Sequence, residues 1–161
     1  MSSGAPGDRN EEDLGVLLVS VSARLNRLYG RVLGQLDTSL TFRQHRLLRR
    51  VDEGHTLMAE LAAFGNLTVP TVSESIEGLV RRGLLTRREN PQNRRANVLS
   101  LTPAGRKAKE AGDAALAAVN ERVLRDVPDE HRSVLHQSLT TVYDAATELF
   151  QESAPAKAAS T

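Results

Sequence analysis

Residues 83–105 read GLLTRRENPQNRRANVLSLTPAG and contain two strand-like runs, residues 84–88 and 95–101, on either side of a turn. The turn is residues 90–93 (NPQN), a combination of Asn and Pro that favours chain reversal. Arginines occur on both sides of this turn. The stretch therefore predicts a β-hairpin that carries positive charge near its tip.

Three helices are predicted before the hairpin, over residues 42–52, 57–64 and 69–82. Thr41 and Thr68 stand where helix N-caps are expected, and Thr68 is followed within the first helical turn by a proline. In the third helix Val72, Ile76 and Leu79 recur at helical spacing and define its buried stripe, which leaves small polar side chains on the other faces. Two short helices joined by a tight turn and followed by a hairpin predict a winged helix-turn-helix.

Long amphipathic helices are predicted outside this segment, over residues 12–36, 103–125 and 130–150. Their apolar stripes are larger than one small winged domain can cover, so we expect a homodimer. The fold class is mainly α with a small β-hairpin wing, a winged helix-turn-helix plus a helical dimerisation region. We expect a flexible tail at residues 1–10, a helical dimerisation region at residues 11–38 and 103–151, a winged helix-turn-helix DNA-binding region at residues 39–102, and a second flexible tail at residues 152–161.

Composition excludes several classes of protein. The chain has no Cys, which excludes disulfides and thiolate metal sites, and no apolar run approaches the ~20 residues of a membrane span. The first ten residues lack a signal-peptide core, so a cytoplasmic protein without membrane association is expected. No catalytic triplet, phosphate loop or dinucleotide motif occurs, and His131 and His136 lie five residues apart, a poor spacing for one metal. We therefore expect no enzyme activity, no cofactor and no metal.

Charge is distributed unevenly along the chain. The stretch from Arg81 to Lys109 carries nine basic residues against one acid, or +8, whereas the rest of the chain carries −7. A basic lobe on an acidic body is typical of a protein that binds phosphates. The alternative is a surface whose charges are balanced by acidic residues folded beside it.

Four motifs in order and spacing resemble the MarR family of bacterial transcription regulators. They are LTFRQ at 40–44, VPTV at 69–72, LVRRGLL at 79–85, and NPQNRRA at 90–96 leading into LTPAG at 101–105. The resemblance covers nearly all of residues 12–150. The family's wing usually reads Asp-Arg-Arg, and here Asn93 stands in place of the Asp. Asn accepts a hydrogen bond but carries no charge, so we expect its bond to a wing arginine to be weaker.

The resemblance implies a homodimer that binds a pseudo-palindromic operator in double-stranded DNA, one recognition helix per half-site. As an acid near DNA, Glu74 is expected either to accept a hydrogen bond from cytosine N4 or to hold an arginine in place. Arg95 matches the arginine that enters the minor groove, with Arg94 as its competitor. The candidate DNA-binding residues are Pro70, Thr71, Ser73, Glu74, Ser75, Arg87, Arg88, Arg94 and Arg95.

Family members are often repressors relieved by a small aromatic or anionic effector, which implies a crevice between the dimerisation region and the winged domain. The resemblance makes Tyr29, His45 and Arg46 its candidate residues here. The plainer interpretation is that His45 lies on a helix surface and Tyr29 serves packing, and we favour it. The alternative to the whole proposal is a winged-helix module that binds protein rather than DNA.

Overall fold

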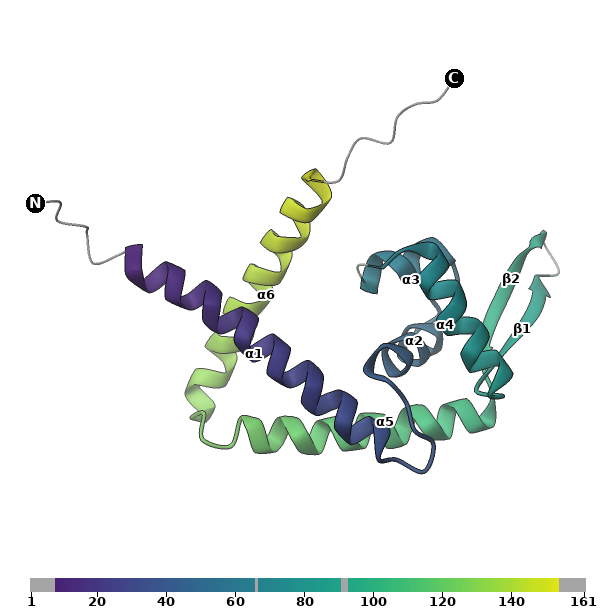
Figure 1. Ribbon diagram of the computed structural model, residues 1–161, viewed down its shortest axis with the longest axis horizontal. Helices are drawn as coiled ribbons and strands as arrows, with labels where there is room; N and C mark the ends of the chain where they lie inside the picture. Colours follow the sequence, from purple (N-terminus) through teal and green to yellow (C-terminus); the bar gives the residue numbers. More distant parts are fainter. Residues whose placement is uncertain (1–7, 66, 91–92, 154–161) are drawn as a thin grey trace, which may run out of the picture. The chain divides into compact units, whose positions relative to one another are not determined.

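The computed structural model describes residues 8–65, 67–90 and 93–153 (Figure 1). Its elements follow the predicted order of helices with one hairpin. They are α1 (Asp8–Gly34), α2 (Phe42–Asp52), α3 (Met58–Gly65), α4 (Val69–Arg81), β1 (Leu85–Asn90), β2 (Asn93–Leu101), α5 (Pro103–Val123) and α6 (Asp129–Glu152). The mainly α fold class with a small two-stranded sheet is confirmed.

The chain divides into two compact units at residue 119. The first unit holds α1 to α4, the hairpin and most of α5, and the second holds the end of α5 and α6. None of the helices in the described parts of the chain is long and apolar enough to cross a membrane.

The core of the first unit lies among α2, α3, α4 and the base of the hairpin. The predicted stripe of α4 is correct, because Val72, Ile76 and Leu79 are fully buried. They pack with leucines from every neighbouring element, among them Leu48 of α2 and Leu61 of α3. Burial of these side chains holds the three short helices together, with the hairpin beside α4 (Figure 1).

Side-chain caps define the starts of α2 and α4. Thr41 and Gln44 form a capping box, in which the Gln44 amide donates to the Thr41 hydroxyl at 3.1 Å and the Thr41 amide to Gln44 Oε1 at 3.0 Å. The Thr71 amide donates to Thr68 Oγ1 at 3.4 Å, the second predicted cap. Both helices begin at the predicted residue as a result.

The hairpin is antiparallel, with Leu85 opposite Leu101 and Arg87 opposite Leu99. Asn90 pairs with Asn93, and the register shifts between Glu89 and Asn90. The strands are longer than the predicted runs at the end that meets the turn, and the turn residues 91–92 lie outside the described residues.

The first turn of α5 lies directly against the turn between α4 and β1. Gly83 ends α4 with a φ of 68°, a conformation that favours glycine. The Thr102 hydroxyl donates to Gly83 O at 2.6 Å, and the Thr102 amide to Leu84 O at 3.1 Å. A Cβ added to Gly105 would lie 1.9 Å from Leu84 O, so only glycine fits there.

We therefore expect Gly105→Ala to lower the free energy of unfolding by about 3 kcal/mol, since a backbone carbonyl cannot move aside as a flexible side chain can. Urea denaturation measures the change. Gly78→Ala in α4 is the matched control, because its Cβ would meet only Arg81 Nη2 at 3.8 Å. The control should raise stability by up to about 1 kcal/mol through helix propensity. Equal stability of wild type and Gly105→Ala would contradict the packing described above.

Candidate nucleic-acid interface

The face of α4 opposite its buried stripe is exposed to solvent. Helical spacing places Pro70, Glu74, Glu77 and Arg81 along this face, and all four are exposed. We call these four residues the outer face of α4. Pro70 and Glu74 were among the predicted contacts. Glu77 and Arg81 were missed, although their i+7 and i+11 spacing from Pro70 is already visible in the sequence.

Three further predicted residues, Thr71, Ser73 and Ser75, flank this outer face and are half-buried. Their hydroxyls already have partners within the helix. Thr71 Oγ1 lies 2.8 Å from Thr68 Oγ1, and Ser75 donates to Thr71 O at 3.0 Å. The Ser73 hydroxyl donates to Glu77 Oε1 at 3.4 Å. Ser73 and Ser75 therefore keep acceptor lone pairs for a ligand, while their protons are used internally.

Two of the basic residues share one acidic partner that lies far away in sequence. Asp52 at the end of α2 accepts from Arg106 Nη1 at 2.8 Å and from Lys109 Nζ at 2.9 Å. These bonds lower the pKa of Asp52 and raise that of Lys109. The alternative of a balanced surface thus applies to this part of the basic stretch.

Arg82 has a structural partner as well. Its guanidinium donates to Ser39 O at 2.5 Å and to Gln44 Oε1 at 3.3 Å, which ties the end of α4 to the start of α2. Among the predicted wing arginines, Arg87 is exposed on β1. The backbones of Arg88, Arg94 and Arg95 belong to the hairpin, but their side chains lie outside the described residues.

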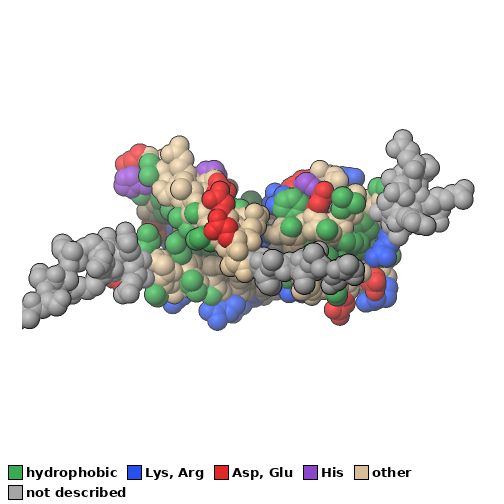
Figure 2. Space-filling view, turned by 90° about the horizontal axis from the view of Figure 1, so that it is seen from above, with side chains coloured by type: hydrophobic (Ala, Val, Ile, Leu, Met, Phe, Trp, Pro, Cys, Tyr) green, Lys and Arg blue, Asp and Glu red, His purple; other side chains and the backbone are tan. Residues whose placement is uncertain are grey.

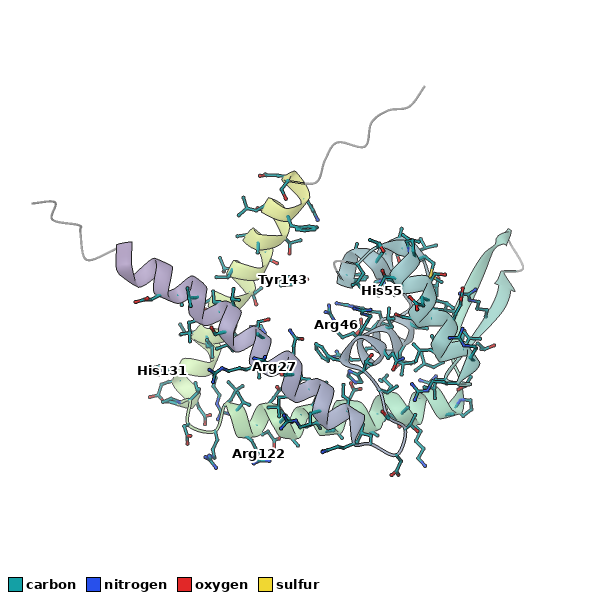
Figure 3. All side chains as sticks on the ribbon, in the orientation of Figure 1. Arg27, Arg46, His55, Arg122, His131 and Tyr143 are labelled. Carbon is teal, nitrogen blue, oxygen red and sulfur yellow. The ribbon has the colours of Figure 1, made fainter. Side chains whose placement is uncertain are left out.

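The three candidate effector residues do not form one site. Tyr29 packs on Phe42, with ring centroids 5.1 Å apart. Arg46 projects from α2 towards α3, where its Nη2 donates to Phe64 O at 2.8 Å (Figure 3). His45, one residue earlier, contacts α5 instead, because adjacent helical residues face different directions.

The surface interpretation of His45 is wrong, since its side chain is 1% exposed. Its Nε2 lies 3.0 Å from Asp113 Oδ1, and because a carboxylate only accepts, Nε2 carries the proton. Nδ1 is buried and has no hydrogen-bond partner among the described residues. Glycine at position 112 makes room for the ring, since a Cβ there would lie 2.5 Å from His45 Cδ2.

Burial is the largest influence on the pKa of His45 and lowers it below the ordinary 6.5. The negative charge of Asp113 and its hydrogen bond raise the pKa of His45 in opposition to burial, and the positive charge of the nearby Arg49 lowers it further. Asp113 itself is shared, with Lys109 Nζ at 3.4 Å and Arg49 Nε at 3.8 Å. The surroundings of His45 between α2 and α5 thus favour its neutral form.

A group that the fold holds neutral makes stability depend on pH. The unfolded chain takes up a proton on His45 near pH 6.5, before the folded chain does, so the free energy of unfolding falls as pH drops through 6.5 towards the lowered folded-state pKa. Urea midpoints between about pH 7.5 and pH 5 should show this loss. His45→Gln should remove that component, and His131→Gln, at an exposed histidine of α6, should retain it. A midpoint in wild type that does not change with pH over this range would refute the assignment.

A short exposed α4, an adjacent hairpin and a supporting α2–α3 pair define the class of protein as a winged helix-turn-helix protein. The model of the MarR family matches residues 38–96, the segment that contains these elements. The winged helix-turn-helix region thus matches the MarR family, and over these residues the resemblance predicted from the sequence is confirmed.

Individual relatives agree with this assignment. The HTH-type transcriptional regulator YdcH of Bacillus subtilis is 33% identical over 96 residues, which is 56% of this chain. The match spans 64% of the length of that curated relative. The family and the structural neighbours are transcription regulators, not enzymes.

Solved structures share the fold. FabT of Streptococcus pneumoniae, solved in complex with DNA, matches this chain with a TM-score of 0.75 at 19% sequence identity. The match covers 86% of this chain and 99% of the FabT chain. CouR of Rhodococcus jostii RHA1, bound to p-coumaroyl-CoA, is 24% identical with a TM-score of 0.70, covering 87% and 95%. The fold thus occurs in a DNA-bound and in a ligand-bound protein.

Proposed function

We propose that the protein is a homodimeric repressor that binds a pseudo-palindromic DNA operator and is released by a small-molecule ligand. The observation that carries the proposal is the exposed outer face of α4 next to an arginine-bearing hairpin. In this arrangement α4 enters the major groove and its side chains contact base edges. The wing supplies positive charge to the phosphate backbone and the minor groove.

The second support comes from relatives of the same fold, one of which is bound to DNA and another to an organic ligand. We assign contacts with the DNA phosphate backbone and the minor groove to the wing arginines Arg87, Arg88, Arg94 and Arg95. Pro70, Thr71, Ser73, Glu74 and Ser75 are assigned to the major groove, and we add Arg81 because it shares the outer face of α4.

Dimerisation is supported by apolar side chains that remain exposed in the described chain. The first half of α1 exposes Leu14, Val16, Leu17, Val19 and Val21. No residue of α6 is buried, and its Leu139 and Val142 are each 44% exposed. Hydrophobic side chains are accordingly visible on the surface in Figure 2. Apolar surface of this extent is typical of a subunit interface.

DNA binding can be tested through salt dependence on a duplex selected from a random-sequence library. Arg95→Ala should weaken binding and reduce the slope of log affinity against log salt by about one phosphate equivalent, roughly 0.9. Arg122→Ala, in the last turn of α5 and labelled in Figure 3, is the control that should leave the slope unchanged. An unaltered slope in Arg95→Ala would remove this residue from the interface. Failure of wild type to bind any duplex at low salt would favour the protein-binding alternative.

The dimer can be tested by sedimentation equilibrium. Leu139→Glu places a charge in the apolar stripe of α6, and we expect it to raise the dimer dissociation constant at least about tenfold. Thr141→Glu adds the same charge at an exposed polar position two residues away and should leave the constant within about twofold. A wild-type protein that sediments as a monomer would refute the homodimer.

A further inference from the structure

Arg82, the residue that follows α4, holds two oxygens that come 43 and 38 residues earlier in the chain. Its Nη2 donates to Ser39 O at 2.5 Å and its Nη1 to Gln44 Oε1 at 3.3 Å. Both bonds come from one charged, planar guanidinium, so they fix its orientation as well as its distance. Ser39 lies in the loop after α1, and Gln44 belongs to the first turn of α2. Arg82 therefore connects the end of α4 to the junction of α1 and α2.

The Gln44 side chain that receives Arg82 also caps α2. Its Oε1 accepts from the Thr41 amide at 3.0 Å as well as from Arg82, so both lone pairs of this oxygen are used. The Gln44 amide in turn donates to Thr41 Oγ1 at 3.1 Å. The capping box thus holds the acceptor oxygen in place, and Arg82 is anchored to a fixed point at the start of α2.

The loop that contains Ser39 is attached to the end of α1. The Leu40 amide donates to Leu33 O at 3.1 Å, and both leucine side chains are buried. The Leu36 amide donates to the same carbonyl at 3.4 Å, which continues the last turn of α1 into the loop. A movement of the end of α1 therefore displaces Ser39, and with it the carbonyl that holds Arg82.

Core packing alone does not fix the end of α4. The buried stripe of the helix ends at Leu79, and apolar contacts are non-directional, so they hold α4 against its neighbours without specifying a small shift or turn. Arg82 lies three residues beyond this stripe and adds two directional bonds. Gly83, the next residue, turns the chain towards β1 with a φ of 68°. The guanidinium thus holds α4 at the point where the chain leaves it for the wing.

We propose that Arg82 is a positioning residue that sets the half-site spacing of the operator. The inference rests on the proposed function, in which α1 lies in the dimer interface and α4 enters the major groove. The contacts from α1 through Ser39 to Arg82 then fix each copy of α4 relative to that interface. A two-fold dimer selects half-sites about one helical turn apart only if its two recognition helices keep a fixed separation. In this role Arg82 acts through Ser39 and Gln44 and needs no contact with DNA.

Duplexes that differ only in the length of the central spacer test the inference on the full-length protein. A duplex selected from a random-sequence library is the reference, and one inserted base pair moves the half-sites about 3.4 Å further apart and turns them by about 35°. The insertion should weaken wild-type binding at least about tenfold, a loss in the range of one mismatched base pair. It should weaken the binding of Arg82→Gln less than about threefold. Because the ratio of the two affinities does not depend on the folded fraction, a loss of stability cannot imitate this effect.

Two further variants separate positioning from charge. Arg82→Lys keeps the charge but replaces the planar guanidinium with a point donor, so its affinity ratio should lie between those of wild type and Arg82→Gln. Arg122→Gln removes a charge from an exposed position in the last turn of α5 and should keep the wild-type ratio. Salt dependence gives an independent readout, because loss of a residue that does not contact phosphate leaves the slope of log affinity against log salt unchanged. We therefore expect Arg82→Gln to keep the wild-type slope.

Four results would overturn the inference and leave the proposed function standing. A wild-type protein that binds both duplexes equally sets no spacing, and a wild-type ratio in Arg82→Gln would show that packing alone positions α4. A slope reduced by about 0.9 in Arg82→Gln would make Arg82 a phosphate contact. A wild-type ratio in Arg82→Lys would show that charge alone is sufficient. Failure of the wild-type protein to bind any duplex at low salt would instead refute the proposed function, and the inference with it.

Discussion

The contact between the first turn of α5 and the α4–β1 turn is the constraint on which the winged helix-turn-helix depends. Gly83 and Leu84 accept hydrogen bonds from Thr102, and Gly105 leaves no space for even a methyl group against Leu84 O. Helix α4 ends two residues before Gly83, and strand β1 begins one residue after Leu84. Because the Thr102 amide, Leu84 O and the Gly105 backbone all belong to the main chain, the close approach of α5 to this turn depends little on adaptable side chains.

A second set of contacts holds α2 between α4 and α5. Arg82 ties the end of α4 to Ser39 and Gln44, and the opposite side of α2 meets α5 through His45–Asp113 and through Asp52 with its two cations. A displacement of α2 would leave the buried imidazole of His45 and the carboxylate of Asp52 without their partners, which costs free energy. The helix α2 therefore connects α4 to α5.

Local sequence signals were sufficient for the elements, and they failed where partners lie far apart in the chain. Thr41 and Thr68 cap their helices within four residues, and the stripe of Val72, Ile76 and Leu79 is a repeat that needs no tertiary information. His45 was placed on the surface because its partner Asp113 is 68 residues away. The sequence left open whether Arg106 and Lys109 are balanced by an acid, because their partner Asp52 precedes them by more than 50 residues.

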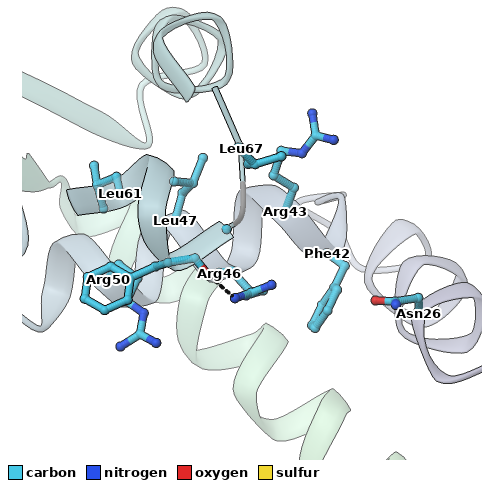
Figure 4. A pocket seen from close by; sticks show the side chains of 10 residues that line it. Asn26, Phe42, Arg43, Arg46, Leu47, Arg50, Leu61 and Leu67 are labelled. Carbon is cyan, nitrogen blue, oxygen red and sulfur yellow. Dashed lines mark hydrogen bonds between the residues drawn. The ribbon is translucent and has the colours of Figure 1, made fainter. Parts of the chain in front are cut away.

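The positions of Arg81 and Glu77 on the outer face of α4 could have been predicted from the sequence. They were left out because the small polar side chains of the helix were chosen as contacts instead. Spacing from Pro70 places both on the side opposite the core, and the structure exposes them. A cavity of about 240 Å³ that opens between α2 and α3, with three arginines of α2 in its lining, could not have been found in this way (Figure 4). Its arginines are regularly spaced, but Phe64 and Leu67 join them only after α3 has folded back on α2.

Under the proposed function, the charges of α4 constrain how the protein can divide its affinity for DNA between specific and non-specific contacts. Its exposed outer face carries two carboxylates, Glu74 and Glu77, against one cation, Arg81. A helix of this charge gains little from the phosphates it approaches, since carboxylates are repelled by them. Non-specific affinity then has to come from cations outside α4, of which the wing holds four. A carboxylate close to DNA is tolerated where it accepts from cytosine or orients an arginine, so the same two acids penalise sequences that offer neither.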